Sequence, residues 1–269
     1  MRANVKIGIC WKVALGLAFF CVVAPSGFAA PNELSALVDR AGEQVAAFLE
    51  VFSEVKCTEH VQQQKLGNNG QVDLKEESTY DYLVILTSAG GELSLDESRL
   101  AVHPAKADKK NTPLLVTNGF ATLFLVFHPY YAGSFRFSAL DDEVSGGRVL
   151  KKVAFQHIHD TRSPAALSLR GREYPLELSG TAWIDPQSAV ITRIEADIGN
   201  TMEDLGMKTL HSDVSYAPVS FRDDKQLYWL PSEAMVEVET PRQHWRNSHR
   251  FTDYKKFSVS TEEQVAKQQ

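Results

Sequence analysis

Residues 180–198 read GTAWIDPQSAVITRIEADI, and this stretch decides the predicted fold. Asp185 and Pro186 begin a four-residue turn of type I between two strand-like runs. After the turn, apolar and polar side chains alternate with a period of two. Val190, Thr192, Ile194, Ala196 and Ile198 point to one face, and Ile191, Arg193, Glu195 and Asp197 point to the other. We therefore predict an antiparallel hairpin with one buried face and one mostly wet face.

The same kind of pattern continues on both sides of this hairpin. Strand-like runs separated by turn signals cover residues 134–139, 148–157, 166–170, 176–184, 209–216, 227–239 and 245–259. Residues 103–112 are polar, charged and contain proline, so we expect an exposed loop there. No repeat or linker divides the chain. We expect one domain over residues 30–269, which at about 240 residues is an ordinary length for a single sandwich or barrel.

Two segments depart from the strand pattern. In residues 32–52, apolar side chains recur at three- and four-residue steps, which predicts an amphipathic helix. Residues 119–127 (GFATLFLVF) are apolar on every side and could form a buried strand or a short helix. The position of Pro129 fits a helix end better. The pattern as a whole predicts an α+β domain, mostly β, whose helices are available to cover the apolar face of one sheet.

The first 29 residues have the organisation of a cleavable signal peptide. Arg2, Lys6 and Lys12 come before an apolar run at residues 13–24, and small residues follow it up to Ala29. This run is too short for a membrane-spanning helix, which needs about 20 residues. We expect cleavage near Ala29, a periplasmic or secreted protein, and no transmembrane segment in the mature chain. An uncleaved anchor is the alternative.

Removal of this leader changes both the charge and the cysteine content. It takes three of the 28 Lys and Arg residues and none of the 34 Asp and Glu residues, so the net charge moves from −6 to about −9. An acidic surface argues against nucleic acid and anionic membranes as partners. Cys10 and Cys21 also leave, so no intramolecular disulfide is open to Cys57. The Cys57 thiol is either buried and inert, the commoner case, or exposed and reactive.

Motifs for catalysis and metal binding are weak. The chain has no nucleophile elbow, P-loop or dinucleotide-binding glycine motif, so we predict no enzyme activity and no cofactor. A dispersed Ser/His/Asp arrangement stays an alternative. His157 and His159 lie two residues apart beside Asp160, so both rings could reach one metal ion. Because no third and fourth ligand is visible, we predict no metal site and interpret the pair as surface histidines.

Large apolar side chains form the better candidate site. Four of them share one helical face of residues 119–127, and two tryptophans lie on predicted strands, where they could line the concave side of a curved sheet. The alternative is that all of them fill an ordinary core. The candidate ligand-binding residues are Phe120, Leu123, Phe124, Phe127, Trp183 and Trp229.

The hairpin of residues 180–195 resembles that of the periplasmic lipoprotein-carrier (LolA/LolB-like) superfamily, whose members shuttle outer-membrane lipoproteins. Residues 57–59 (CTE), 230–233 (LPSE) and 250–257 (RFTDYKKF) are similar to a branch of bacterial exported proteins within or near it. The resemblance implies an incomplete, strongly curved antiparallel barrel with helices covering its concave face. It also implies a cavity for acyl chains and no catalytic residues. The carriers themselves lack the 103–112 loop.

These observations predict an exported, non-enzymatic protein that binds a lipid, the acyl chain of a lipoprotein or another hydrophobic small molecule. A first alternative is an envelope sensor that uses the same fold to dock another protein. A hydrolase is the third possibility, and it would need a nucleophile, a base and an orienting group that converge in one cleft.

Overall fold

The computed structural model describes residues 31–89, 92–102, 120–169, 172–199, 202, 206–222 and 226–257. The expected leader and the expected loop at residues 103–112 lie outside these ranges. The helices are α1 (Pro31–Phe52), the 3₁₀ helix η1 (Phe120–Phe127) and α2 (Pro129–Ala132). The strands are β1 (Val55–Leu66), β2 (Val72–Ala89), β3 (Glu92–Ala101), β4 (Phe135–Ala139), β5 (Glu143–Ser145), β6 (Arg148–His157), β7 (Ala166–Leu169), β8 (Arg172–Pro175), β9 (Leu178–Ile184), β10 (Ile191–Ile198), β11 (Thr209–Ser220), β12 (Leu227–Glu239) and β13 (His244–Lys256).

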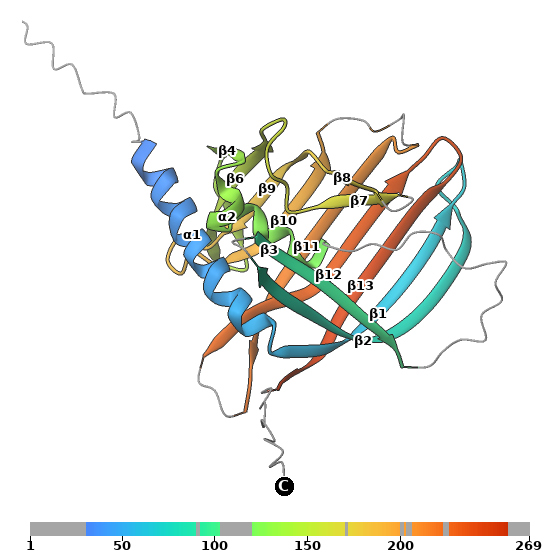
Figure 1. Cartoon of the computed structure of the whole chain (residues 1–269), viewed down its shortest axis with the longest axis horizontal. Coiled ribbons are helices and arrows are strands. Elements are labelled where there is room, and N and C mark those ends of the chain that lie inside the picture. Colours follow the sequence, from blue (N-terminus) through green and yellow to red (C-terminus); the bar gives the residue numbers. More distant parts are fainter. Residues whose placement is uncertain are drawn as a thin grey trace, which may run out of the picture.

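One large antiparallel sheet forms the body of the molecule. Its order is β3-β2-β1-β13-β12-β11-β10-β9-β6-β4, with β5 paired to β6, and β7 and β8 form a separate hairpin. The first and last long strands, β1 and β13, are neighbours in the sheet although they lie at opposite ends of the strand sequence. Figure 1 shows the sheet curving, with α1 and α2 lying against it. The predicted α+β fold with a curved, open antiparallel sheet is confirmed.

The edge strands β3 and β4 do not pair with each other, and α2 lies between them. The hydroxyl of Tyr131 in α2 donates a hydrogen bond of 3.0 Å to the carbonyl of Leu93 in β3. On the other side, the ring of Phe127, just before α2, lies 5.1 Å from the ring of Phe137 in β4. The segment from Phe127 to Tyr131 therefore contacts both edge strands, which do not pair as they would in a closed barrel.

Helix α1 is amphipathic as predicted. Its buried side chains follow the three- and four-residue steps: Leu37, Val38, Ala41, Val45, Leu49 and Phe52. The helix crosses η1 at Gly42, where a Cβ atom would lie 2.6 Å from the carbonyl oxygen of Phe127. Only glycine permits such a close backbone approach. This contact sets the position of α1 over the sheet.

The ambiguous apolar segment is the 3₁₀ helix η1. Its five described side chains, from Leu123 to Phe127, are at most 4% exposed. The segment is apolar on every side because it packs against α1 on one side and against β10, β11 and β12 on the other. The expectation of a second short apolar helix over the sheet is confirmed.

The deciding hairpin forms as predicted, with one change in the orientation of its side chains. Asp185 Oδ1 accepts hydrogen bonds from the backbone N–H groups of Gln187 (2.9 Å) and Ser188 (3.0 Å). A bulge then shifts the register between Ile191 and Arg193. Ile191 was expected to point to the wet face, but it is 6% exposed and belongs to the core. An extra residue on one strand reverses the alternation of side chains at that point.

Candidate functional site

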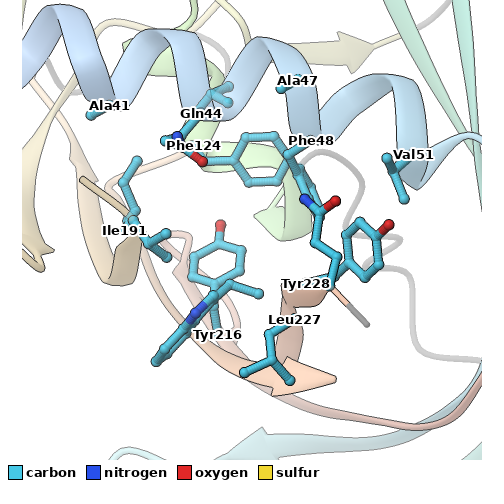
Figure 2. Close-up of a pocket in the computed structure, with 14 residues that line it drawn as sticks. Ala41, Gln44, Ala47, Phe48, Val51, Phe124, Ile191, Tyr216, Leu227 and Tyr228 are labelled. Carbon is cyan, nitrogen blue, oxygen red and sulfur yellow. The ribbon is translucent and has the colours of Figure 1, made fainter. Parts of the chain in front are cut away.

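A pocket opens between α1 and the sheet. Its cavity volume is about 100 Å³, and the empty space rises to about 630 Å³ when the part that is open to solvent is included. Figure 2 shows α1 forming one wall, with aromatic rings from η1 and the sheet below it. The lining residues come from five parts of the chain: Ala41, Gln44, Val45, Ala47, Phe48, Val51, Phe124, Val190, Ile191, Tyr216, Gln226, Leu227, Tyr228 and Trp229.

Phe124 lies at the centre of the aromatic side of this pocket. Its ring meets the ring of Phe48 edge to face at 5.1 Å and the ring of Tyr216 at 5.7 Å. Such edge-to-face pairs are favourable beyond the area that they bury. Ala41 and Ala47 also belong to the part of the lining that α1 supplies. The pocket is thus a gap beside an ordered aromatic cluster.

The hairpin turn and two strand ends build the opposite wall. Val190 and Ile191 follow the turn, and the bulge described above directs Ile191 toward the pocket side of the sheet. A second bulge, between Ser215 and Tyr216, interrupts the pairing of β11 with β12 at this wall. Leu227 at the start of β12 is 61% exposed, so a large apolar side chain lies in solvent at the mouth.

The polar side chains in the described part of the lining are uncharged. They are the amides of Gln44 and Gln226 and the hydroxyls of Tyr216 and Tyr228, and no Asp, Glu, Lys or Arg among the described residues lines the pocket. The Tyr216 hydroxyl is hydrogen-bonded to the backbone of Phe124, and burial raises the pKa of Tyr216 well above its usual value. The phenol therefore stays neutral at any physiological pH.

Two cations lie near the pocket, and each has a carboxylate partner. The Arg148 guanidinium lies 5.4 Å from the centre of the Trp229 ring and 3.7 Å from an Asp185 oxygen. A similar contact places the ammonium of Lys256 5.5 Å from the Tyr228 ring and 3.8 Å from the carboxylate of Glu54. These pairs balance the local charge while the cations cover the outer faces of aromatic rings.

The candidates from the sequence divide among three places. Phe124 and Trp229 line the pocket. Leu123 and Phe127 belong to the neighbouring core. Phe120 lies in η1, but its side chain is outside the described part of the structure.

Trp183 does not lie on the pocket side of the sheet, where we expected it. Its strand neighbours Ala182 and Ile184 face the core, so the indole projects from the opposite face. There it contacts Arg193 across the strand pair, at 4.5 Å from the guanidinium to the ring centre, and its Nε1 donates to Glu143 Oε2 at 2.8 Å. Successive side chains of a strand point to opposite faces of the sheet, so Trp183 cannot share the face of Ala182 and Ile184.

The two histidines of the H-x-H pair have separate environments. The interpretation of both as surface histidines was wrong for His157, which is buried, with its Nε2 3.0 Å from the carbonyl oxygen of Arg162. His159 is exposed and pairs through Nδ1 with Glu177, and this hydrogen bond raises its pKa. Among the described residues, no group of three or more His, Cys, Asp and Glu side chains is arranged to hold a metal ion.

A buried charged cluster, which the sequence analysis missed, lies on the inner face of β1, β3 and β13. Arg99 Nε donates to Glu59 Oε2 at 2.6 Å, and a second nitrogen of Arg99 lies 3.0 Å from a Glu97 oxygen. His249 Nδ1 lies 2.9 Å from the other oxygen of Glu59, whose side chain is fully buried. We call Glu59, Glu97, Arg99 and His249 the inner charge cluster. A glutamate at an inward position of the alternating run 55–61 (VKCTEHV) was its signal in the sequence.

The inner charge cluster controls the ionisation of Glu59. Burial by itself would raise the pKa of this carboxyl, but hydrogen bonds from His249 and Arg99 outweigh it, and the pKa is lowered. At nearby Cys57, burial has the largest effect and raises the pKa of the thiol to about 12. Cys57 is therefore buried and protonated, as in the inert alternative considered for it.

We expect acid to destabilise the protein partly through Glu59. Its folded-state pKa is below the unfolded value of about 4.3. The stabilisation is therefore fully present above the unfolded pKa and is lost as the pH falls through the folded pKa. Urea unfolding measured between about pH 7 and pH 3 tests this. Glu59→Gln should be less stable at neutral pH and should show a shallower loss in acid, and equal slopes for the two proteins would contradict the assignment.

No protein-family model matches the sequence, and no curated protein matches it. Among solved structures, a DUF1329 family protein from Desulfovibrio piger is similar with a TM-score of 0.43 and 8% identity, over 86% of this chain and 95% of that chain. A putative outer membrane lipoprotein-sorting protein domain from Vibrio parahaemolyticus is similar with a TM-score of 0.39 and 13% identity, over 84% and 94%. No described helix is both long enough and apolar enough to cross a membrane.

Proposed function

We propose that the protein is an exported, non-enzymatic binding protein that holds an acyl chain or similar hydrophobic ligand between α1 and the sheet. One observation carries the proposal. A solvent-open pocket, whose described lining residues are apolar, aromatic or uncharged polar, lies in a chain whose net charge is −6. Open apolar pockets with a few polar groups are the usual form of small-molecule sites.

The driving force for such binding is the removal of apolar surface from water. Each buried methylene contributes about 0.8 kcal/mol, so roughly six methylenes in the pocket would contribute about 5 kcal/mol before the costs of association. The exposed Leu227 and the half-buried Trp229 at the mouth would lose water-exposed area when a chain enters. A longer chain would continue from the mouth along the protein surface.

We also propose that the protein acts outside the cytoplasmic membrane. Residues 1–29 would be removed near Ala29, and residues 30–269 would act as a single domain in the periplasm or outside the cell. Sequencing the N-terminus of the exported protein tests this part. A mature protein that still begins at Met1 would contradict it.

The binding proposal is tested with protein expressed from the full chain and purified after export. Organic extraction followed by mass spectrometry should detect a co-purifying lipid. After removal of this lipid, the uncharged dye N-phenyl-1-naphthylamine should gain fluorescence on binding, and the gain should saturate at one dye per chain. Absence of both a bound lipid and a saturable dye signal would overturn the proposal.

A substitution that fills the pocket should abolish dye binding. Ala47 lies on the α1 wall and is exposed, so Ala47→Trp places a large ring in the empty space without disturbing the core. We expect the dye affinity to fall at least about ten-fold, since one pocket-sized ring occupies the site. Fluorescence titration gives the affinity.

Ala36→Trp is the matched control for this variant. Ala36 is also an exposed alanine of α1, but it lies outside the pocket lining. Its dye affinity should equal that of the unmodified protein. Equal affinities for both tryptophan variants would show that the dye binds elsewhere.

A further inference from the structure

We infer that the pocket selects uncharged amphiphiles, such as alkyl alcohols and acyl esters, over free fatty acids and alkyl amines of the same length. This inference rests on the proposed function, because it specifies the ligand class of the same site. It starts from the chemistry of the lining, where the polar side chains among the described residues are the amides of Gln44 and Gln226 and the phenols of Tyr216 and Tyr228.

The Gln44 amide is the group best placed to contact a ligand. Gln44 is an exposed residue on the α1 wall, above Ile191 and next to the Phe124 ring (Figure 2). An amide can donate a hydrogen bond to an ester carbonyl or accept one from a hydroxyl. The Tyr216 hydroxyl, by contrast, is already bonded to the Phe124 backbone. The pocket can therefore satisfy a neutral polar group at its mouth.

The nearby cations are poor partners for an anionic headgroup. Arg148 and Lys256 each have a carboxylate partner within 4 Å, at Asp185 and Glu54. Arg40 of α1 donates to the carbonyl oxygens of Pro186 (3.0 Å) and Gln187 (3.5 Å), and it is outside the lining. An anionic ligand would have to break one of these contacts to gain a counter-ion.

The cost of desolvation then decides the selectivity. An ionised carboxylate or ammonium that leaves water without a counter-ion loses much of its hydration, whereas an ester or hydroxyl needs only one or two hydrogen bonds. The open mouth lets a charged headgroup stay partly hydrated. We therefore expect a preference of at least about ten-fold, which corresponds to about 1.4 kcal/mol.

Displacement of N-phenyl-1-naphthylamine by four ligands of equal chain length measures the preference. Dodecanol and methyl dodecanoate should displace the dye at concentrations at least about ten-fold lower than dodecanoate and dodecylamine at pH 8. All four are used below the concentration at which they aggregate. Lowering the pH toward the carboxyl pKa should tighten binding of the fatty acid and leave dodecanol unchanged.

Gln44→Lys provides the complementary variant. An ammonium at the mouth should strengthen dodecanoate binding about ten-fold and so largely remove the preference for dodecanol, because it supplies the missing counter-ion. Gln44→Met, the uncharged control of similar length, should leave dodecanoate binding weak. Dodecanoate or dodecylamine binding to the unmodified protein as tightly as dodecanol would overturn the inference alone. Failure of the dye itself to bind would instead overturn the proposed function on which it rests.

Discussion

Replacing Arg99 by methionine is expected to lower the free energy of unfolding by about 3–5 kcal/mol, the usual cost of removing one partner from a buried ion pair. Arg99 holds Glu59 and Glu97 together inside the curved sheet, and the two carboxylate side chains are 0% and 2% exposed. Methionine fills a similar volume but leaves both acids without their shared cation. Urea unfolding followed by circular dichroism at pH 7 gives the free energy.

Arg246→Met is the matched control for this experiment. Arg246 also pairs with a glutamate, Glu237, at 2.8 Å, but its side chain is 40% exposed. Solvent screens a pair of this kind, and such pairs contribute about 0–1 kcal/mol. If Arg99→Met costs no more than Arg246→Met, the inner charge cluster does not stabilise the fold. A partial recovery with Arg99→Lys would show that charge alone supplies part of the effect, since lysine lacks the planar fork of arginine.

A second large loss of stability is expected when Gly180 in β9 is replaced by alanine. A Cβ atom there would overlap the carbonyl oxygen of Glu195 in the adjacent strand and would lie 2.7 Å from Cζ of Phe155. The Phe155 ring can rotate away, but the backbone of β10 cannot move without breaking its ladder. We expect Gly180→Ala to destabilise the protein by about 3 kcal/mol, at the upper end of the range for overpacked sites. A thermal or urea melt measures this loss.

Gly133→Ala is the control for the glycine substitution. Gly133 follows α2 with a φ of −64°, and no atom lies within 4 Å of its would-be Cβ. Alanine should be neutral there or should stabilise by about 0.4–1 kcal/mol, because it restricts the unfolded chain. A Gly180→Ala protein as stable as Gly133→Ala would mean that β9 and β10 are farther apart than the structure shows.

Local periodicity explains why much of the fold follows from the sequence. The apolar stripe of α1 and the alternation around the 185–188 turn are patterns within single elements, so each predicts its own conformation. The orientation of Ile191 depends on a β-bulge between Ile191 and Arg193. A bulge is a mismatch between two paired strands, so the sequence of one strand gives little sign of it. For η1 the sequence left strand and helix open, because a segment buried on every side has no period to detect.

The sequence could not predict which residues form the inner charge cluster. Glu59 and Arg99 are 40 residues apart, and Glu59 and His249 are 190 residues apart. An inward glutamate in an apolar run indicates that a buried carboxylate needs a partner. Which cation supplies it depends on the strand order β3-β2-β1-β13, and that order is a property of the assembled sheet.

Only part of the candidate site could be found from the sequence. Phe124 and Trp229 were found as large apolar residues, but the sequence offered no reason to separate them from Leu123 or Trp183. The α1 wall was missed because alanine and glutamine on an amphipathic helix are ordinary residues. A pocket consists of space that side chains leave unfilled, and the volumes that meet there come from five separate parts of the chain.

By itself, the sequence determined the elements: the amphipathic helix, the short apolar helix as one of two options, and the antiparallel strands with their turns. These follow from periodicity and turn chemistry, which act over a few residues. Only the tertiary structure decided which apolar side chains fill the core and which surround a gap. It also brought together charges that lie far apart in the sequence. The grouping of the charges depends on the strand order of the sheet. The division between core and pocket depends also on the close contact of Gly42 with Phe127, which sets α1 against η1 over the sheet.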